Sequence, residues 1–219
     1  MGTPCPRLVL TALRGGSGKT TMTLGLLAAW RQRGRTVVPF KKGPDYIDPA
    51  WHALAAGCPC YNLDPFFMSG EQMLYTLRQH TVAAPGALIE GNRGLFDGLD
   101  VNGTCSTAEL AKVLQAPVVL VVDCTMTTRT AAAIVLGCQK FDPDVHLRGV
   151  ILNQIARPRH EGLLRAAIEQ YCDIPVLGAV PRLKCAVFPE RHMGLVPPPE
   201  HRAAREAVAT AQNLAEKYL

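Results

Sequence analysis

The amino-acid sequence predicts an α/β fold, a doubly wound and mostly parallel sheet with helices on both of its faces. Short apolar runs alternate along the chain with longer stretches of helical periodicity, which is the order that parallel strands joined by helices require. The run at 118–122, Val-Val-Leu-Val-Val, is apolar without alternation, as expected for a strand covered on both faces. A glycine-rich turn follows the first apolar run, and ligands of such folds bind where the strands end.

The expected elements follow one another along the whole chain. Apolar and β-branched runs predict strands at 7–12, 36–40, 86–90, 117–122, 147–153 and 175–179. Helical periodicity predicts helices at 20–33, 70–81, 107–115, 127–140, 159–171 and 201–217. The stretch 41–69 is dense in Pro, Gly, Asp and aromatic residues, so it is expected to be a functional loop. Residues 1–219 are predicted to form one domain, because 48% hydrophobic content suffices for a single core.

Composition and charge exclude several classes of function. The net charge is +5 and the Lys and Arg residues are scattered, so no nucleic-acid partner is expected. No apolar run reaches about 18 residues and no signal peptide opens the chain, so we expect no membrane partner and a cytoplasmic protein. The eight cysteines form no C-x-x-C pair, which favours free thiols in a reducing compartment; a metal role for Cys58 and Cys60 is the minor alternative.

The segment 14–21, Arg-Gly-Gly-Ser-Gly-Lys-Thr-Thr, is a candidate phosphate-binding loop. It stands between a strand and a helix, and its glycines let successive backbone N–H groups point inward. Leu13 occupies the place where the usual pattern has its first glycine, so the loop is of a variant type. Thr20 is placed to bind the Mg²⁺ of a nucleoside triphosphate. The residues predicted to bind nucleotide here are Gly15, Gly16, Ser17, Gly18, Lys19, Thr20 and Thr21.

Polar side chains also follow two other predicted strands. Lys41, Asp45 and Asp48 come within eight residues after the second strand, and Glu90 comes directly after Ala-Leu-Ile in the third. Cations and carboxylates together are what a site needs to hold phosphate and its metal. Any one of these acids could equally be a turn former or a helix cap. Their arrival at successive strand ends beside a phosphate loop favours a shared site.

Six segments in order resemble the synthetase domain of the cobyrinic acid a,c-diamide synthase family, whose P-loop NTPase fold is dethiobiotin-synthetase-like. They lie at 41–49, 62–64, 90–98, 106–112, 149–153 and 189–195. The resemblance implies an ATP- and Mg²⁺-dependent ligase that amidates the a and c carboxylates of cobyrinic acid through an acyl phosphate. Activating a carboxylate in this way is chemically reasonable, because phosphate is a far better leaving group than oxide.

The resemblance also implies roles for individual residues. It places Lys19 on the β- and γ-phosphates and Lys41 where the γ-phosphoryl group meets the substrate carboxylate. The implied catalytic residues are Lys19, Lys41, Asp48 and Asp97, where the two aspartates orient substrate or bind a second metal. The implied metal ligands are Thr20, Asp45 and Glu90, and Asn153 is expected to read adenine. Weaker expectations place Glu190, Arg191 and His192 near nucleotide or substrate, and let Ser106 and Thr107 either touch substrate or cap a helix.

Partners and alternatives complete the predictions. The implied partner is a tetrapyrrole polycarboxylate, and a homodimer is expected by analogy. The family's glutaminase domain is predicted to be absent from this chain, so ammonia would come from a separate domain or subunit. One alternative is a partitioning-type ATPase switch, in which Arg14 reaches across a dimer. Another is amidation of a different tetrapyrrole, such as sirohydrochlorin or its nickel complex, or the two-carboxylate reaction of biotin synthesis.

Overall fold

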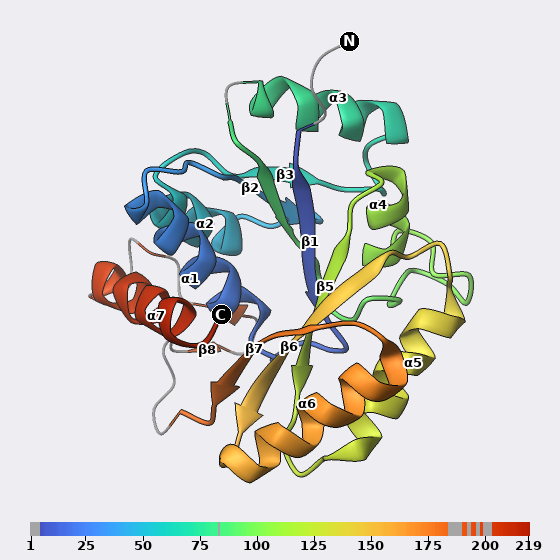
Figure 1. Cartoon of the computed structure of the whole chain (residues 1–219). Helices are drawn as coiled ribbons and strands as arrows, with labels where there is room; N and C mark the ends of the chain where they lie inside the picture. The colour runs from blue at the N-terminus through green and yellow to red at the C-terminus, as the bar shows by residue number, and fades with distance from the viewer. Residues whose placement is uncertain (1–4, 83, 184–189, 192–193, 196–197, 199–202) are drawn as a thin grey trace.

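A seven-stranded sheet forms the centre of the molecule, in the order β3-β2-β4-β1-β5-β6-β7 (Figure 1). The computed structural model describes residues 5–82, 84–183, 190–191, 194–195, 198 and 203–219. The strands are β1 (Arg7–Ala12), β2 (Val38–Lys42), β3 (Tyr61–Leu63), β4 (Ala87–Glu90), β5 (Val118–Asp123), β6 (Leu147–Ile155) and β7 (Val176–Pro181). Neighbouring strands pair in parallel throughout this sheet. The predicted doubly wound α/β fold is therefore confirmed.

Helices cover both faces of the sheet. They are α1 (Lys19–Gln32), α2 (Ile47–Ala56), α3 (Gly70–Thr81), α4 (Thr107–Val113), α5 (Arg129–Phe141), α6 (Pro158–Cys172) and α7 (Ala204–Tyr218). Helices α1, α2 and α7 contribute to the core on one face, and α3, α4, α5 and α6 contribute to the core on the other. A short antiparallel pair, β8 (Glu190–Arg191) and β9 (Gly194–Leu195), precedes α7.

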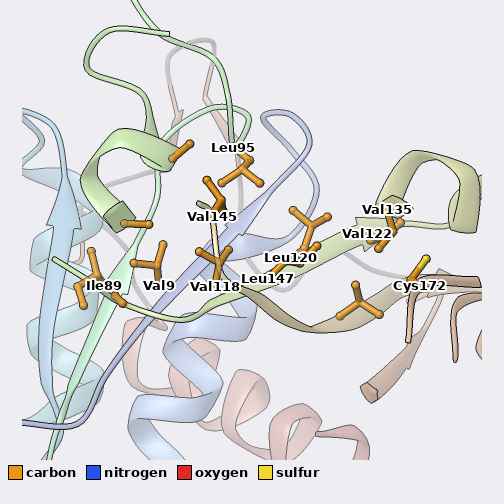
Figure 2. Close-up of a cluster of buried hydrophobic side chains, with 14 of the residues drawn as sticks. Val9, Ile89, Leu95, Val118, Leu120, Val122, Val135, Val145, Leu147 and Cys172 are labelled. Atoms are coloured by element: carbon orange, nitrogen blue, oxygen red, sulfur yellow. The ribbon is translucent and has the colours of Figure 1, made fainter. Parts of the chain in front are cut away.

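Strand β5 shows why several strands are apolar without alternation. Val118, Leu120 and Val122 belong to the core under α3 to α6, whereas Val119 and Val121 belong to the core under α1, α2 and α7. Figure 2 shows the first of these clusters, with Val118, Leu120 and Val122 lying beside side chains of the neighbouring strands and helices. Since successive side chains of a strand point to opposite faces, a strand between two helical layers must be apolar at every position.

The stretch 41–69 differs from its prediction as a loop, because it contains α2 and β3. Asp45 lies two residues before the first residue of α2, and its Oδ1 accepts hydrogen bonds from the backbone N–H groups of Ile47 at 3.0 Å and Asp48 at 3.3 Å. Pro49 lies in the first turn, where a missing N–H costs nothing. Trp51 is fully buried among the side chains of α1 and α7. The turn-forming residues before α2 therefore led to the prediction of a loop, although the apolar residues that follow them form a helix.

The other elements lie close to their predicted positions. Helix α3 has the predicted bounds, and it begins with a reciprocal cap in which Ser69 and Gln72 bond each other's backbone N–H groups. Helix α7 packs on α1 so closely that a Cβ on Gly25 would lie 2.4 Å from the carbonyl oxygen of Ala211. The predicted start of the last helix, 201–202, and His192 lie outside the described residues.

Candidate active site

The glycine-rich turn forms a curled loop between β1 and α1. Gly16 has φ +72° and Gly18 has φ +93°, left-handed values that favour glycine. Lys19 follows as the first residue of α1, and its side chain is buried within the loop. Its ammonium donates to the backbone carbonyls of Arg14 at 3.1 Å and Arg93 at 2.8 Å. Burial lowers the pKa of Lys19, an effect that the charge of Glu90 opposes.

Asn153, at the end region of β6, holds this loop from the side. Its Nδ2 donates to the carbonyl of Ser17 at 2.9 Å, and its Oδ1 accepts from the N–H of Gln154 at 2.9 Å. Ser17 in turn donates its hydroxyl to the carbonyl of Arg14 at 3.1 Å. A Cβ at Gly18 would lie 2.4 Å from the Asn153 amide nitrogen. The structure thus brings Asn153 to the phosphate loop, where it supports the backbone; its role in reading adenine stays a prediction.

Charged side chains meet beside the loop, from β2, α2 and β4. Lys41 and Glu90 are register partners across β2 and β4. The Lys41 ammonium lies 2.7 Å from Glu90 Oε1 and 2.7 Å from Asp48 Oδ2. The Thr20 hydroxyl donates to the same Oε1 at 2.9 Å. Lys41 and Glu90 are buried, with side-chain exposures of 3% and 0%. We call Thr20, Lys41, Asp48, His52 and Glu90 the charge cluster.

His52 is the member of the charge cluster that the sequence predictions missed. Its Nε2 lies 2.8 Å from Glu90 Oε2, and both side chains have 0% exposure. Its Nδ1 faces the thiol of Cys60 at 3.7 Å. One signal could have found it: Asp48 and His52 stand four residues apart in α2, so both project from one face of that helix. Reading 41–69 as a loop hid this spacing.

The charges of the cluster shift one another's protonation. Burial alone would raise the pKa of Glu90, but the charge of Lys41 and the contact with His52 outweigh it and hold the pKa well below its usual range. Burial would lower the pKa of Lys41, yet Glu90 and Asp48 raise it above its ordinary value. Burial and then the charge of Glu90 raise the pKa of Asp48, against the attraction of Lys41. Lys41 and Glu90 therefore form the firmly charged pair.

Two other predicted acids have local roles in the structure. Asp45 caps α2 through its Oδ1, and its carbonyl accepts from the Asn62 amide at 2.7 Å. Asp97 is exposed, and its Oδ2 accepts from the N–H of Gly94 at 2.9 Å. The negative charge of Asp97 is one of the effects that oppose the lowering of the Lys19 pKa by burial. Asp45 contacts the charge cluster through the backbone N–H of Asp48, and the roles of both aspartates toward metal and substrate stay predictions.

The segment 106–112 behaves as a helix start. The Ser106 side chain accepts from the N–H of Glu109 at 3.1 Å and so caps α4. Thr107 is buried and bonds the backbone of Asn92 through both its donor and its acceptor. Capping and loop support thus account for both residues. The backbones of Glu190 and Arg191 lie in β8, and nothing is described for their side chains.

The residues present suit a nucleotide with Mg²⁺ in a specific way. Because the Thr20 hydroxyl donates its hydrogen bond to Glu90, the lone pairs of its oxygen remain for a metal. Glu90 itself is already engaged by Thr20 and Lys41 at one oxygen and by His52 at the other, so it acts through Thr20. Within the described residues, no group of three or more His, Cys, Asp and Glu side chains could hold a metal. Such a site fits Mg²⁺, which usually keeps waters and binds substrate phosphates with few protein ligands.

The Arg14 guanidinium has a partner within the chain, because it lies 2.9 Å from Asp123 Oδ2 at the end of β5.

The seven cysteines in the described part of the chain are free, and two of them, Cys124 and Cys172, are buried. The Cys58 thiol points to the Val37 carbonyl at 4.0 Å rather than joining Cys60. Among the helices that the structure describes, none combines the length and the apolar character needed to cross a membrane.

Comparisons with known proteins identify the family of the chain. Residues 8–196 match the family described as the CobQ/CobB/MinD/ParA nucleotide binding domain. The cobyrinate a,c-diamide synthase of Magnetococcus marinus is 50% identical over 98% of this chain and 46% of its own length. The hydrogenobyrinate a,c-diamide synthase of Brucella ovis is 45% identical over 96% of this chain and 48% of its own length. The chain therefore spans about half the length of these curated relatives. The resemblance predicted from the six segments is confirmed.

A solved structure supports the fold. A ParA family ATPase from Chlorobium tepidum superposes with a TM-score of 0.55 at 12% identity, covering 98% of this chain and 93% of that one. At such low identity the likeness concerns the path of the backbone alone. It agrees with a parallel sheet whose first strand leads into a phosphate loop.

Proposed function

Since the chain belongs to the CobQ/CobB/MinD/ParA nucleotide binding domain family, we propose that it binds ATP and Mg²⁺ and amidates side-chain carboxylates of cobyrinate or a related tetrapyrrole. The observation that supports this most directly is the position of Lys41, paired at 2.7 Å with both Glu90 and Asp48 beside the phosphate loop. A cation held there suits the meeting of a γ-phosphoryl group with a substrate carboxylate. The relatives at 50% and 45% identity are both named as a,c-diamide synthases.

The phosphate loop is proposed to hold the nucleotide. Gly15 and Gly16 are exposed, and no atom lies within 4 Å of a Cβ built on either, so the backbone here is open to a ligand. Lys19 bonds neutral carbonyls in this structure. Phosphate oxygens would give its ammonium stronger, charge-assisted bonds in their place. The residues proposed to bind nucleotide remain Gly15, Gly16, Ser17, Gly18, Lys19, Thr20 and Thr21, with Asn153 supporting the loop and reading adenine.

The proposed reaction has two steps. A carboxylate oxygen of the substrate attacks the γ-phosphorus of ATP, and ADP leaves, so an acyl phosphate forms. Ammonia then attacks the acyl carbon, phosphate leaves, and the nitrogen loses a proton to give the amide. Lys41 stabilises charge during the first step, while Asp48 and Asp97 orient the substrate or bind a second metal. Thr20 and Asp45 would hold Mg²⁺, with Glu90 fixing the Thr20 hydroxyl, and the metal would neutralise charge on the phosphates.

Partners follow from the same proposal. The substrate is a tetrapyrrole polycarboxylate. We propose that residues 1–219 act as a single synthetase domain. Ammonia would be supplied by a glutaminase domain or subunit outside this domain, and the domain would work as a homodimer in the cytoplasm.

The test is ATP hydrolysis by the purified chain with Mg²⁺ and ammonium, in the presence and absence of cobyrinic acid, hydrogenobyrinic acid or sirohydrochlorin. We expect ADP release that depends on one tetrapyrrole, with one amide formed per ADP by mass spectrometry. Glutamine in place of ammonium should give no amide with the chain alone. ADP release that no tetrapyrrole accelerates would contradict the proposed activity.

The partitioning-type switch remains the alternative. It would need Arg14 to leave Asp123, its partner at 2.9 Å within the same chain. Under that alternative, ATP would drive dimer formation and hydrolysis would be slow with every tetrapyrrole. Sedimentation with and without ATP, beside the hydrolysis assay, separates the two functions.

A further inference from the structure

A line of three side chains runs from the half-buried Cys60 to the buried His52 and Glu90 of the charge cluster. Cys60 immediately precedes β3, His52 lies in α2, and Glu90 ends β4. The Cys60 thiol faces His52 Nδ1 at 3.7 Å, and His52 Nε2 faces Glu90 Oε2 at 2.8 Å. His52 and Glu90 have no exposed side-chain surface. Nothing in the proposed reaction uses Cys60 or His52.

The donors and acceptors of the three groups allow one continuous set of hydrogen bonds. Glu90 is a carboxylate, which can only accept, so His52 Nε2 carries the hydrogen that joins them. In a neutral ring Nδ1 is then bare and accepts. Burial, followed by the nearby charge of Glu90, raises the pKa of the Cys60 thiol, so the sulfur keeps its hydrogen and can donate it. The thiol, the ring and the carboxylate can therefore pair in one line, in which His52 Nδ1 at 3.7 Å is a nearer acceptor for the Cys60 thiol than the Tyr61 carbonyl at 4.0 Å.

We propose that Cys60 and His52 are positioning residues that set one ring tautomer and hold Glu90 by Oε2, so that Oε1 receives Thr20 and Lys41. This inference rests on the proposed function, because it assigns the pair to the ATP and Mg²⁺ site. A carboxylate free to turn would share its bonds between two orientations, and the Thr20 hydroxyl would lose its fixed acceptor. Partners of this outer kind orient the groups that touch a metal, and their loss typically costs about 10- to 100-fold in affinity or activity.

Two other uses of the same residues fit less well. A cysteine beside a histidine could be a nucleophile, but that needs a thiolate at an open surface, and the Cys60 thiol is held protonated next to a fully buried ring. A metal held by thiols is also disfavoured, since Cys58 points instead to the Val37 carbonyl. The observed contacts therefore favour a role for Cys60 and His52 in holding Glu90 in position.

Two changes at position 52 test the support of Glu90. His52→Leu removes the donor and keeps much of the volume, whereas His52→Gln can place an amide N–H near the position of Nε2. We expect His52→Leu to raise the Mg²⁺ concentration for half-maximal, tetrapyrrole-dependent turnover by about 10- to 100-fold, and His52→Gln to recover most of it. ATP affinity without Mg²⁺, measured by calorimetry, should stay within about 3-fold of the unchanged protein, because the phosphate loop is intact. Equal Mg²⁺ dependence in His52→Leu and the unchanged protein would overturn the proposal.

A matched pair of cysteine variants tests the outer link and also works if His52→Leu fails to fold. Cys60→Ala removes the donor, Cys60→Ser keeps a hydroxyl donor, and Cys58→Ala is the control because the Cys58 thiol faces the Val37 carbonyl and not His52. Nitrogen NMR of the labelled chain, with the His52 signals assigned by their loss in His52→Gln, reports the tautomer directly. We expect the Nε2–H form in the unchanged protein, in Cys60→Ser and in Cys58→Ala, and a mixture of tautomers in Cys60→Ala.

The NMR experiment separates this inference from the proposed function. An Nε2–H ring that depends on Cys60, in a protein without tetrapyrrole-dependent turnover, would refute the amidating activity and keep the hydrogen-bonded chain. An Nδ1–H ring, or a ring indifferent to Cys60→Ala, would overturn the inference even in a protein that amidates.

Discussion

The phosphate loop and the charge cluster stand side by side but are built in opposite ways. The loop is one continuous segment, partly exposed, that presents backbone groups and a single lysine. The charge cluster joins side chains of α1, β2, α2 and β4, and its Lys41, His52 and Glu90 are buried. Backbone groups persist whatever side chains surround them, whereas buried charges depend on one another. We therefore expect changes in the loop to affect ligands and changes in the charge cluster to affect the fold as well.

The largest expected effect is on stability, from Lys41→Met. It leaves the carboxylate of Glu90 buried without its cation, since both side chains are almost wholly covered. Breaking a buried ion pair in this way costs about 3–5 kcal/mol of the free energy of unfolding. Denaturation in urea, monitored by circular dichroism, measures the loss. The double variant Lys41→Met/Glu90→Leu should recover part of it, because the apolar pair needs no compensation while His52 and Thr20 lose their acceptor.

The control for this variant is a surface ion pair. Lys112 and Asp142 lie 2.7 Å apart, and their side chains are 39% and 22% exposed. Lys112→Met should cost less than about 1 kcal/mol, because water screens the pair and can replace either partner. Equal losses of the free energy of unfolding in Lys41→Met and Lys112→Met would contradict the view that the buried charges of the cluster depend on one another.

The second prediction concerns the loop, where Lys19→Ala should affect turnover more than stability. The acceptors that Lys19 leaves are the neutral carbonyls of Arg14 and Arg93, not a buried carboxylate. Loss of a cation aimed at developing charge lowers turnover by about 10²- to 10³-fold. Tetrapyrrole-dependent ADP release and urea denaturation measure the two effects. Lys140→Ala, at an exposed position of α5, is the control. A variant that keeps full turnover would remove Lys19 from the nucleotide site.

The third prediction sharpens the contrast through pH. The pKa of Glu90 is lowered in the folded protein, so the folded state binds that proton less tightly than the unfolded chain. Its stabilising contribution is complete above the unfolded value of about 4.3 and is lost as the pH falls below it. Protonation of Asp48, whose pKa burial raises, favours the folded state and offsets part of this loss.

The double variant Lys41→Met/Glu90→Leu provides the comparison for this pH dependence. Without Glu90, its free energy of unfolding should fall less steeply between pH 4 and pH 3, by up to about 1.4 kcal/mol per pH unit. Lys112→Met should follow the unchanged protein. If the free energy of unfolding varied with pH in the same way in the double variant and the unchanged protein, Glu90 would have the same pKa in the folded and unfolded states.

The same contrast explains what the sequence could predict. The loop and most helices and strands follow from neighbouring residues, such as the Ser69 and Gln72 pair that begins α3. Lys41 and Glu90 are 49 positions apart in the sequence, and they meet only because β2 lies next to β4 in the sheet. No local sequence pattern predicts that these two strands are neighbours. The resemblance named both residues without showing their contact. His52 was missed because the turn-forming residues before it hid its helix.

The smallest expected effect belongs to Arg14, and it separates the two proposed functions. Arg14 is exposed on the loop, with 72% of its side chain accessible, and it pairs only at the surface with Asp123. Arg14→Ala should therefore cost less than about 1 kcal/mol of stability. In a synthetase it should leave tetrapyrrole-dependent turnover nearly unchanged, because Lys19 and Lys41 supply the cations at the phosphates. In a switch, an arginine that completes a partner's site would be worth about 10³-fold or more in hydrolysis. Parallel assays of Arg14→Ala and Asp123→Asn decide the point, since only the loss of a trans-acting cation would leave Asp123→Asn active while Arg14→Ala is not.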